Sequence, residues 1–154
     1  MPDHCIMGVD PGVSGAVAFF FPSHPENIAV YDVPSIGKEI NCPELAALIR
    51  QYQPTVAIVE AVHSFPGQGV SSSFNFGMSY GMARGVIAAM GVPTKLAAPT
   101  KWKKYFGLTK DKDASRRLAI MNWPTCPHFS RKKDDGRAEA ALLALYLAQN
   151  LNSY

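Results

Sequence analysis

Residues 5–21 read CIMGVDPGVSGAVAFFF, and this stretch sets the architecture that we expect for the chain. Two apolar runs, 5–10 and 14–21, flank the turn-forming segment PGVSG, a pattern that predicts a β-hairpin. The first run ends in Asp10. A carboxylate beside a buried strand is destabilising unless another group compensates its charge. The hairpin therefore supplies both the start of a sheet and a first candidate site residue.

Further strands and helices follow the hairpin in an order that predicts the fold class. Three more segments have the composition of strands, at 27–33 (NIAVYDV), 55–60 (TVAIVE) and 94–98 (TKLAA). Helical patterns occupy 43–52, 74–90, 99–106, 113–123 and 138–149, and 124–133 reads as a basic linker. A hairpin and third strand followed by crossovers predict an α/β fold, with a five-stranded mixed sheet flanked by helices.

The helix expected at 74–90 is rich in small residues, including Gly77, Gly81 and Gly85. We expect these residues to let the helix pack closely on the sheet, with Phe74 and Phe76 in the core between them. Before this helix, 63–73 (HSFPGQGVSSS) has the composition of a flexible loop.

The composition of the 154 residues predicts one folded domain spanning 1–154 and excludes a disordered chain, because 47% are hydrophobic and 18% are charged. No apolar run approaches the roughly 18 residues of a membrane helix, and the N-terminus lacks the pattern of a secretory signal. Cys5, Cys42 and Cys126 are odd in number and widely spaced. We therefore expect free thiols in a reducing, cytoplasmic location, without membrane association.

The charge is unevenly distributed along the chain. Residues 1–94 have a net charge of −4 and residues 95–154 a net charge of +7, which together give the overall +3. Eleven of the fifteen basic residues lie between Lys101 and Arg137. Such a stripe is typical of a surface that binds a polyanion, nucleic acid above all. The alternative is a solvated, lysine-rich surface without a partner.

The acidic residues form a possible metal site. Two strands expected to be buried end in Asp10 and Glu60, and Asp134, Asp135 and Glu139 lie at the start of the last helix. Carboxylates that converge without a nearby arginine repel one another, and a divalent cation relieves that repulsion. Oxygen-only ligands favour Mg²⁺, with Mn²⁺ as a substitute. Alternatively, Asp134 and Asp135 cap the helix, Glu139 is a solvated first-turn acid and Asp10 forms a turn before Pro11.

Several motifs, taken in order, resemble the RuvC family of Holliday-junction resolvases. They are GVDPGVSGAVAFF at 8–20, AIVEAV at 57–62, GMSYGMARGVIAA at 77–89, AAPTKWKKYFG at 97–107 and DGRAEAALLALY at 135–146. The short chain and the DGRAEA form are similar to the bacteriophage branch of that family. A phage protein would act in the cytoplasm of its bacterial host.

The resemblance implies a ribonuclease-H-like fold, a homodimer, Mg²⁺ dependence and paired, symmetric nicks in four-way DNA. Asp10, Glu60 and Glu139 match acids of the family. A further family aspartate falls here on Gly136, so that Asp135 is our substitute and Asp134 the next choice. Lys112 and Lys104 occupy places similar to the family's lysines near the scissile phosphate, with Lys101 and Lys103 as close rivals. The expected catalytic residues are Asp10, Glu60, Lys112, Asp135 and Glu139.

The same resemblance places an aromatic wedge shortly after the second acid, where this chain has His63 and Phe65. Phe65 either stacks on an unpaired base or packs on the protein itself. Arg84 either anchors its helix or contacts phosphate, and the small residues of 74–90 suit a dimer interface. The expected DNA-binding residues are His63, Phe65, Lys101, Lys103, Lys104, Lys110, Lys112, Arg116, Arg131, Lys132 and Lys133.

Three other functions compete with a junction-resolving endonuclease. A nuclease of the same fold acts on RNA, flaps or replication forks instead of four-way junctions. A non-catalytic protein binds junctions without cutting them. A nucleotide-binding domain uses the PGVSG turn to hold phosphate, but it needs a second phosphate loop and a partner domain, for which 154 residues leave no room.

Overall fold

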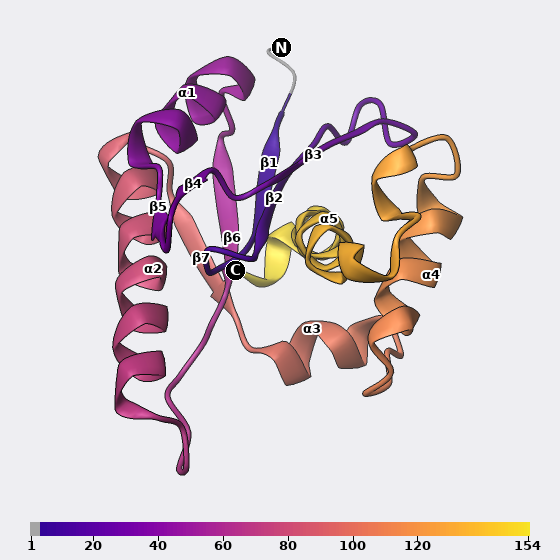
Figure 1. The fold of residues 1–154 in the computed structure, drawn as a ribbon. Coiled ribbons are helices and arrows are strands. Elements are labelled where there is room, and N and C mark those ends of the chain that lie inside the picture. Colours follow the sequence, from indigo (N-terminus) through magenta and orange to yellow (C-terminus); the bar gives the residue numbers. More distant parts are fainter. Residues whose placement is uncertain (1–3) are drawn as a thin grey trace.

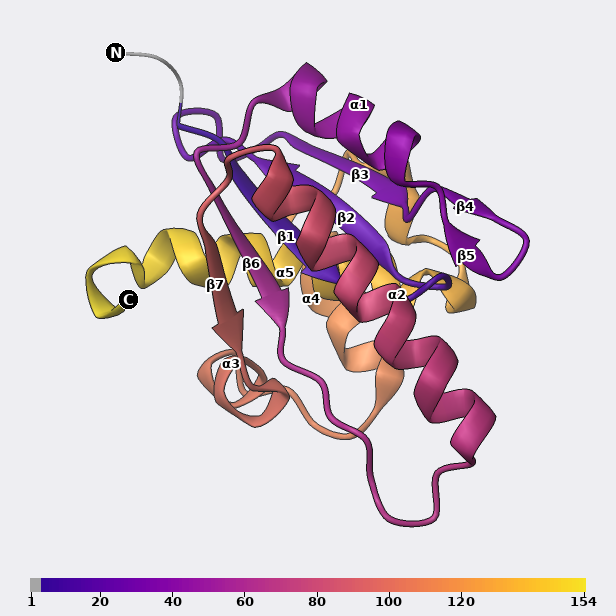
Figure 2. The same cartoon turned by 90° about the vertical axis from the view of Figure 1, so that its left-hand side faces the viewer.

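The computed structural model describes residues 4–154, apart from the side chain of Lys112, and places a mixed sheet between two helical layers (Figures 1 and 2). The five strands are β1 (Ile6–Asp10), β2 (Ala16–Phe20), β3 (Ile28–Asp32), β6 (Val56–Glu60) and β7 (Thr94–Ala97), in the order β3-β2-β1-β6-β7. The first three strands pair antiparallel, whereas β6 and β7 are added parallel to β1. The predicted fold class and all five predicted strands are confirmed.

Two apolar layers hold the helices against the sheet. α1 (Cys42–Tyr52) and α2 (Val70–Ala89) cover one face, where Leu45 and Ile87 pack among the side chains of β1, β2 and β6. α5 (Asp135–Gln149) covers the other face, α4 (Lys112–Asn122) packs on α5, and α3 (Pro99–Tyr105) follows β7 directly. The short elements are β4 (Ser35–Ile36), β5 (Glu39–Ile40), η1 (Pro127–Phe129), η2 (Lys132–Asp134) and η3 (Leu151–Ser153).

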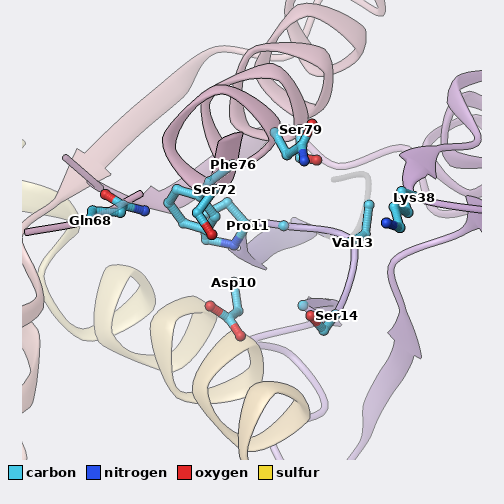
Figure 3. Close-up of a pocket in the computed structure, with 12 residues that line it drawn as sticks. Asp10, Pro11, Val13, Ser14, Lys38, Gln68, Ser72, Phe76 and Ser79 are labelled. Atoms are coloured by element: carbon cyan, nitrogen blue, oxygen red, sulfur yellow. The ribbon is translucent and has the colours of Figure 1, made fainter. Parts of the chain in front are cut away.

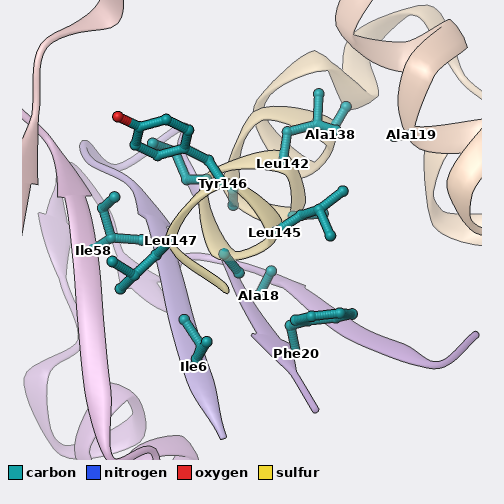
Figure 4. Packing of buried hydrophobic residues seen from close by; sticks show 14 of the residues in the cluster. Ile6, Ala18, Phe20, Ile58, Ala119, Ala138, Leu142, Leu145, Tyr146 and Leu147 are labelled. Atoms are coloured by element: carbon teal, nitrogen blue, oxygen red, sulfur yellow. The ribbon is translucent and has the colours of Figure 1, made fainter. Parts of the chain in front are cut away.

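The last helix is buried along most of its length and crosses the sheet over β1 (Figure 4). Its alanines let the helix backbone come close to the strand, while Leu147 lies beside Ile58 of the sheet. The approach is closest at Gly8, where an added Cβ would lie 2.0 Å from the carbonyl oxygen of Ala140. Glycine at this position is therefore what allows α5 to lie on the sheet.

Three expectations for the region around α2 are wrong. α2 begins at Val70 rather than Phe74, so the end of the expected loop is helical. An added Cβ at Gly77, Gly81 or Gly85 would meet nothing within 4 Å, which means that these glycines face away from the sheet. Phe74 is 70% exposed and Phe76 only half-buried, because the first half of α2 extends beyond the end of the sheet (Figure 2).

Smaller differences lie in the connections. The β4–β5 hairpin was not predicted, because two-residue strands leave no periodic pattern to detect. The basic linker contains two 3-10 turns, and Phe129 in the first of them is fully buried. Within residues 4–154, no helix combines the length and the hydropathy needed to cross a membrane.

Candidate metal centre

Three carboxylates from distant parts of the chain meet at one edge of the sheet. Asp10 and Glu60 are the last residues of β1 and β6, and the pairing of Val9 with Val59 places the two acids at the same end of these parallel strands. Glu139 lies in α5, which crosses β1. One carboxylate oxygen from each of the three lies within 4.8 Å of the others. We call these three residues the acid trio.

Burial and mutual repulsion destabilise the ionised form of the trio. Burial raises the pKa of Asp10 well above its ordinary value of 3.8, and the charges of Glu139, Glu60 and Asp135 raise it further. Burial also raises the pKa of Glu60, with a smaller contribution from Glu139. A bound divalent cation stabilises the ionised form of such a cluster. An all-oxygen donor set suits Mg²⁺ or Mn²⁺ better than zinc, so the residues present fit the expected metal.

Trp102 holds the carboxylate of Glu60 in position through a hydrogen bond. Its indole Nε1 donates a 2.8 Å hydrogen bond to Oε2 of Glu60, and the whole side chain is buried. This bond lowers the pKa of Glu60 against the effect of burial. Sequence analysis did not single out Trp102, although it lies inside the quoted motif AAPTKWKKYFG. One feature of the sequence could have indicated its role: the tryptophan lies in the first turn of α3, which directly follows β7, the strand beside β6.

One of the predicted lysines, Lys103, lies beside the trio. Lys103 Nζ is 3.1 Å from Oε1 of Glu139, and its charge lowers the pKa of both Asp10 and Glu60. Lys103, Lys104 and Lys110 line a cavity of about 580 Å³ that reaches Glu139. The Lys101 ammonium lies 4.8 Å from the ring centre of Tyr154 instead. The predicted catalytic residue Lys112 begins α4, and its side chain lies outside the described residues.

Asp134 and Asp135, which precede Glu139 in the chain, have different surroundings. Asp134 is 1% exposed and bound by Arg131, whose backbone N–H donates to Oδ2 at 2.8 Å and whose Nη2 donates to Oδ1 at 2.8 Å. Burial alone would raise the pKa of Asp134, but the bonds from Arg131 outweigh it and lower the pKa. Asp135 is near enough to raise the pKa of Asp10 but is not part of the trio.

Gly136, in the first turn of α5, lies against the carboxylate of Asp10. An added Cβ at Gly136 would lie 2.9 Å from Oδ2 of Asp10, because the start of α5 is pressed against that carboxylate. A side chain at 136 requires Asp10 or the helix to shift. Position 136, where the resemblance to the RuvC family places a further aspartate, therefore lies directly beside the carboxylate of Asp10.

The remaining predicted DNA-binding residues lie in two regions. His63 and Phe65 are exposed in the loop before α2, and the Phe65 side chain is 64% exposed. Lys132 and Lys133 are exposed in η2. Arg116 donates to the backbone oxygens of Phe129 and Ser130 and pairs with Asp113, whereas Arg131 pairs with Asp134. The structure thus gives both arginines an internal role. The Arg84 guanidinium stacks over Tyr80, 5.3 Å from the ring centre.

Solved RuvC structures superpose on nearly the whole chain. RuvC of Thermus thermophilus in complex with a Holliday junction substrate superposes with a TM-score of 0.73 at 14% identity, over 97% of this chain and 96% of that one. A second Thermus thermophilus RuvC structure gives 0.61 at 13% identity, over 94% and 95% of the two chains. The chain has the RuvC fold.

The yeast mitochondrial Holliday junction resolvase Ydc2 is also similar, with a TM-score of 0.56 and 17% identity over 99% of this chain and 82% of that one. No protein-family model matches the sequence, and no curated protein sequence matches it. The similarity is therefore one of fold, and the RuvC fold agrees with the ribonuclease-H-like architecture expected from the sequence.

Proposed function

We propose that this protein is a divalent-metal-dependent endonuclease that resolves Holliday junctions and other branched DNA by paired phosphodiester hydrolysis. The observation that carries the proposal is the acid trio, formed by the ends of β1 and β6 and by α5 within a RuvC fold. A raised pKa of Asp10 in that position is typical of a site that functions with a bound cation. The substrate class is taken from the similar solved structures, a RuvC in complex with a Holliday junction substrate and the yeast mitochondrial Holliday junction resolvase Ydc2.

In this proposal Asp10, Glu60 and Glu139 hold Mg²⁺, or Mn²⁺ in its place, and Asp135 completes the ligand set. The bound metal supplies an activated water and neutralises charge on the reacting phosphate. Trp102 would hold the carboxylate of Glu60 in place through its hydrogen bond to Oε2. Lys103, and Lys112 as predicted from the resemblance, stabilise the negative charge that develops on the phosphate.

Several cations and one aromatic residue would bind the DNA around this centre. Lys103, Lys104 and Lys110 line the cavity that reaches Glu139 and are placed to hold phosphates on one side of the cut. Lys101, Lys132 and Lys133 would extend this contact, so affinity should fall steeply with salt. Phe65, exposed on its loop, would stack on an unpaired base at the branch point, with His63 beside it.

A homodimer would let each subunit cut one of two equivalent strands, because a four-way junction has two-fold symmetry. α2 offers a surface for it. Its outward face exposes Val70 and Phe74 and then Gly77, Gly81 and Gly85, around which there is open space for a second helix. The free cysteines Cys5, Cys42 and Cys126 are consistent with action in a reducing cytoplasm, bacterial or that of a phage host.

The test is cleavage of a synthetic four-way junction in the presence of Mg²⁺. Asp10→Asn should abolish nicking and preserve junction binding, because it removes a metal ligand without removing a DNA contact. Glu26→Gln is the matched control, since Glu26 is an exposed acid in the β2–β3 turn at the opposite end of the sheet. An Asp10→Asn variant that cuts at the wild-type rate would refute the assigned site. Wild-type protein that binds junctions but never cuts them would indicate the non-catalytic alternative.

A further inference from the structure

The acid trio is accessible from two sides, and a cation contacts it from one of them. On the α2 side, a cavity of about 420 Å³ reaches Asp10 (Figure 3). The one cation that lines this cavity is Lys38, which Figure 3 shows beside Val13 and away from Asp10. On the α3 side, the cavity of about 580 Å³ reaches Glu139, and the Lys103 ammonium lies 3.1 Å from Glu139 Oε1. Within the described residues, Lys103 is therefore the cation in contact with the trio.

The ion pair between Lys103 and Glu139 differs from the others in this chain. Among the side chains that the structure describes, every other acid paired with a lysine or arginine is paired with arginine, as Asp134 is with Arg131. A guanidinium group can hold a carboxylate through two parallel hydrogen bonds, whereas the lysine ammonium is a point charge on a flexible stem. The side chains of Lys103 and Glu139 are also 34% and 20% exposed, and such a pair is weak. A stronger cation can therefore displace Lys103.

Lys103 would compete with a divalent cation for the trio. The ammonium group already contacts Glu139, and a bound ion with twice its charge would lie close enough to repel it. In the metal-free protein the same ammonium stabilises the trio, because its charge lowers the pKa of Asp10 and of Glu60 against the effect of burial. Lys103 is thus a counter-ion that stabilises the metal-free state and weakens metal binding.

The cavity on the α3 side gives the displaced side chain a second position. Lys103 lines this cavity together with Lys104 and Lys110, on the side where the proposed function places DNA phosphates. The flexible stem of Lys103 lets its ammonium turn from the carboxylate to a phosphate without a movement of α3. The helix itself is anchored by the preceding residue, since Trp102 is fully buried and donates to Glu60.

We propose that Lys103 exchanges partners: it pairs with Glu139 in the metal-free protein, leaves Glu139 when the metal binds, and then contacts the phosphate that is cut. The inference rests on the proposed nuclease function and deepens it, because it couples metal binding to DNA binding. A phosphate that holds Lys103 away from the trio raises the affinity for the metal, and by linkage the metal raises the affinity for that phosphate. The metal centre is therefore loaded most fully when DNA is in place.

The first experiment measures metal binding without DNA. Mn²⁺ dissociation constants are determined at pH 8, by electron paramagnetic resonance of the free ion, for wild type, Lys103→Met and Lys103→Arg. Lys104→Met is the matched control, because Lys104 is the next residue of α3, lines the same cavity and makes no ion pair with a described residue.

Lys103→Met should lower the Mn²⁺ dissociation constant about tenfold, because it removes a competing charge beside Glu139. Lys103→Arg, which keeps the charge, should resemble wild type. Lys104→Met should change the constant by less than about twofold, because an exposed charge farther from the trio is screened by solvent.

The second experiment measures single-turnover cleavage of a four-way junction as a function of Mn²⁺ concentration. Lys103→Met should reach its half-maximal rate at a lower Mn²⁺ concentration than wild type. Its maximal rate should be at least about tenfold lower, because the contact with the phosphate is lost. A residue that only supports the fold would weaken metal binding and cleavage together, so the opposite signs of the two effects identify the exchange.

A Mn²⁺ dissociation constant in Lys103→Met that equals or exceeds the wild-type value would overturn the inference and leave the nuclease function intact. An equal tightening in Lys104→Met would also overturn it, since the effect would then come from the overall charge of the cavity. Tighter Mn²⁺ binding in Lys103→Met with an unchanged maximal rate would show that Lys103 does not reach the phosphate, and would overturn the exchange. Wild type that binds Mn²⁺ no better than Asp10→Asn would refute the proposed metal site and the inference with it.

Discussion

Two groups of carboxylates in this molecule are built from the same residue types but have opposite electrostatics. The acid trio of Asp10, Glu60 and Glu139 gathers three carboxylates around one lysine, and the pKa of Asp10 and of Glu60 is raised. Asp134 and Asp32 lie against Arg131 and Arg137, and the pKa of each is lowered. We call this second set the arginine-paired group.

The difference separates the candidate metal ligands from the acids that stabilise the fold. The arginine-paired group is compensated within the chain: Arg137 donates to both oxygens of Asp32, at 2.7 and 2.9 Å, and links η2 and α5 to β3. The trio is under-compensated, and it gains stability only when something positive arrives from outside. Proximity to an arginine, rather than acidity or burial, therefore separates structural acids from candidate metal ligands in this chain.

The largest expected effect is the loss of activity when the trio loses one member. Glu139→Gln should reduce the single-turnover rate of junction cleavage by at least about 10³-fold, because metal-ion catalysis supplies several kcal/mol of transition-state stabilisation. Asp32→Asn, in the other group, should stay within about threefold of wild type, because an exposed ion pair contributes little. Similar losses in both variants would show that the two groups are not functionally distinct.

The second effect concerns stability. Here a substitution in the arginine-paired group should be more destabilising than one in the trio. Asp134→Ala should lower the free energy of unfolding by about 2–3 kcal/mol, because it removes a buried hydrogen-bond acceptor at the start of α5 and leaves Arg131 unpaired. Metal-free Asp10→Asn should be at least as stable as wild type, because a buried repulsion disappears. Urea denaturation in a metal chelator measures both variants. A destabilised Asp10→Asn beside a neutral Asp134→Ala would reverse the assignment of roles.

A smaller effect is expected from the residue that positions Glu60. Trp102→Phe keeps the buried ring but removes the Nε1 donor, so the Mn²⁺ dissociation constant should rise about tenfold, as expected for a lost hydrogen bond to a charged group. Titration with Mn²⁺, in which electron paramagnetic resonance detects the free ion, measures this dissociation constant without a DNA cleavage assay. Trp123→Phe is the control, because Trp123 donates to the backbone oxygen of Pro25 instead. Equal Mn²⁺ affinities in the two variants would restrict Trp102 to a packing role.

The smallest effect is a pH dependence of opposite sign in the two groups. The folded pKa of Asp10 lies above 3.8 and that of Glu60 above 4.5, so the stability of the metal-free protein should decrease as pH rises from about 4 towards neutrality. The folded pKa values of Asp134 and Asp32 lie below 3.8, so their contribution is complete above that pH and is lost as pH falls.

Chemical denaturation at several pH values tests these signs. Saturating Mg²⁺ should remove the decrease towards neutral pH, and Asp10→Asn should weaken it in the metal-free protein. A metal-free stability that rises from pH 5 to pH 7 in wild type would contradict the electrostatics described for the trio.

The sheet and most helices were predictable because local patterns decide them. Each of the five strands is an apolar or alternating run bounded by turn residues, and β6 (Val56–Glu60) is buried from end to end as its composition indicated. The ends of β1 and β6 carry Asp10 and Glu60, and parallel pairing alone brings these two together. Glu139 could be included because it lies with Asp134 and Asp135 near the start of the last helix, in a segment that resembles the acidic helix of the RuvC family.

The rest depends on contacts between distant residues, which no local pattern encodes. The spacing of Asp134 from Glu139 does not say that Arg131 holds Asp134, so Asp134 was kept among the candidate ligands. Trp102 reaches Glu60 across 42 positions of sequence. Phe74 was expected in the core because it is aromatic, yet α2 passes the end of the sheet at that point and leaves it exposed. These features depend on how the helices and strands are placed relative to one another. The sequence of a single element does not determine that placement.

The glycine at position 8 has a consequence for the whole metal centre. Since Gly8 lies against Ala140, the neighbour of Glu139, the absent methyl group determines how far the third carboxylate stands from the other two. A single carbon atom added at Gly8, on the apolar side of the strand, would lift the helix and widen the trio without altering any acid. The affinity of the proposed site for a divalent cation would thus depend on a steric contact inside the core, at a residue that never touches the ion.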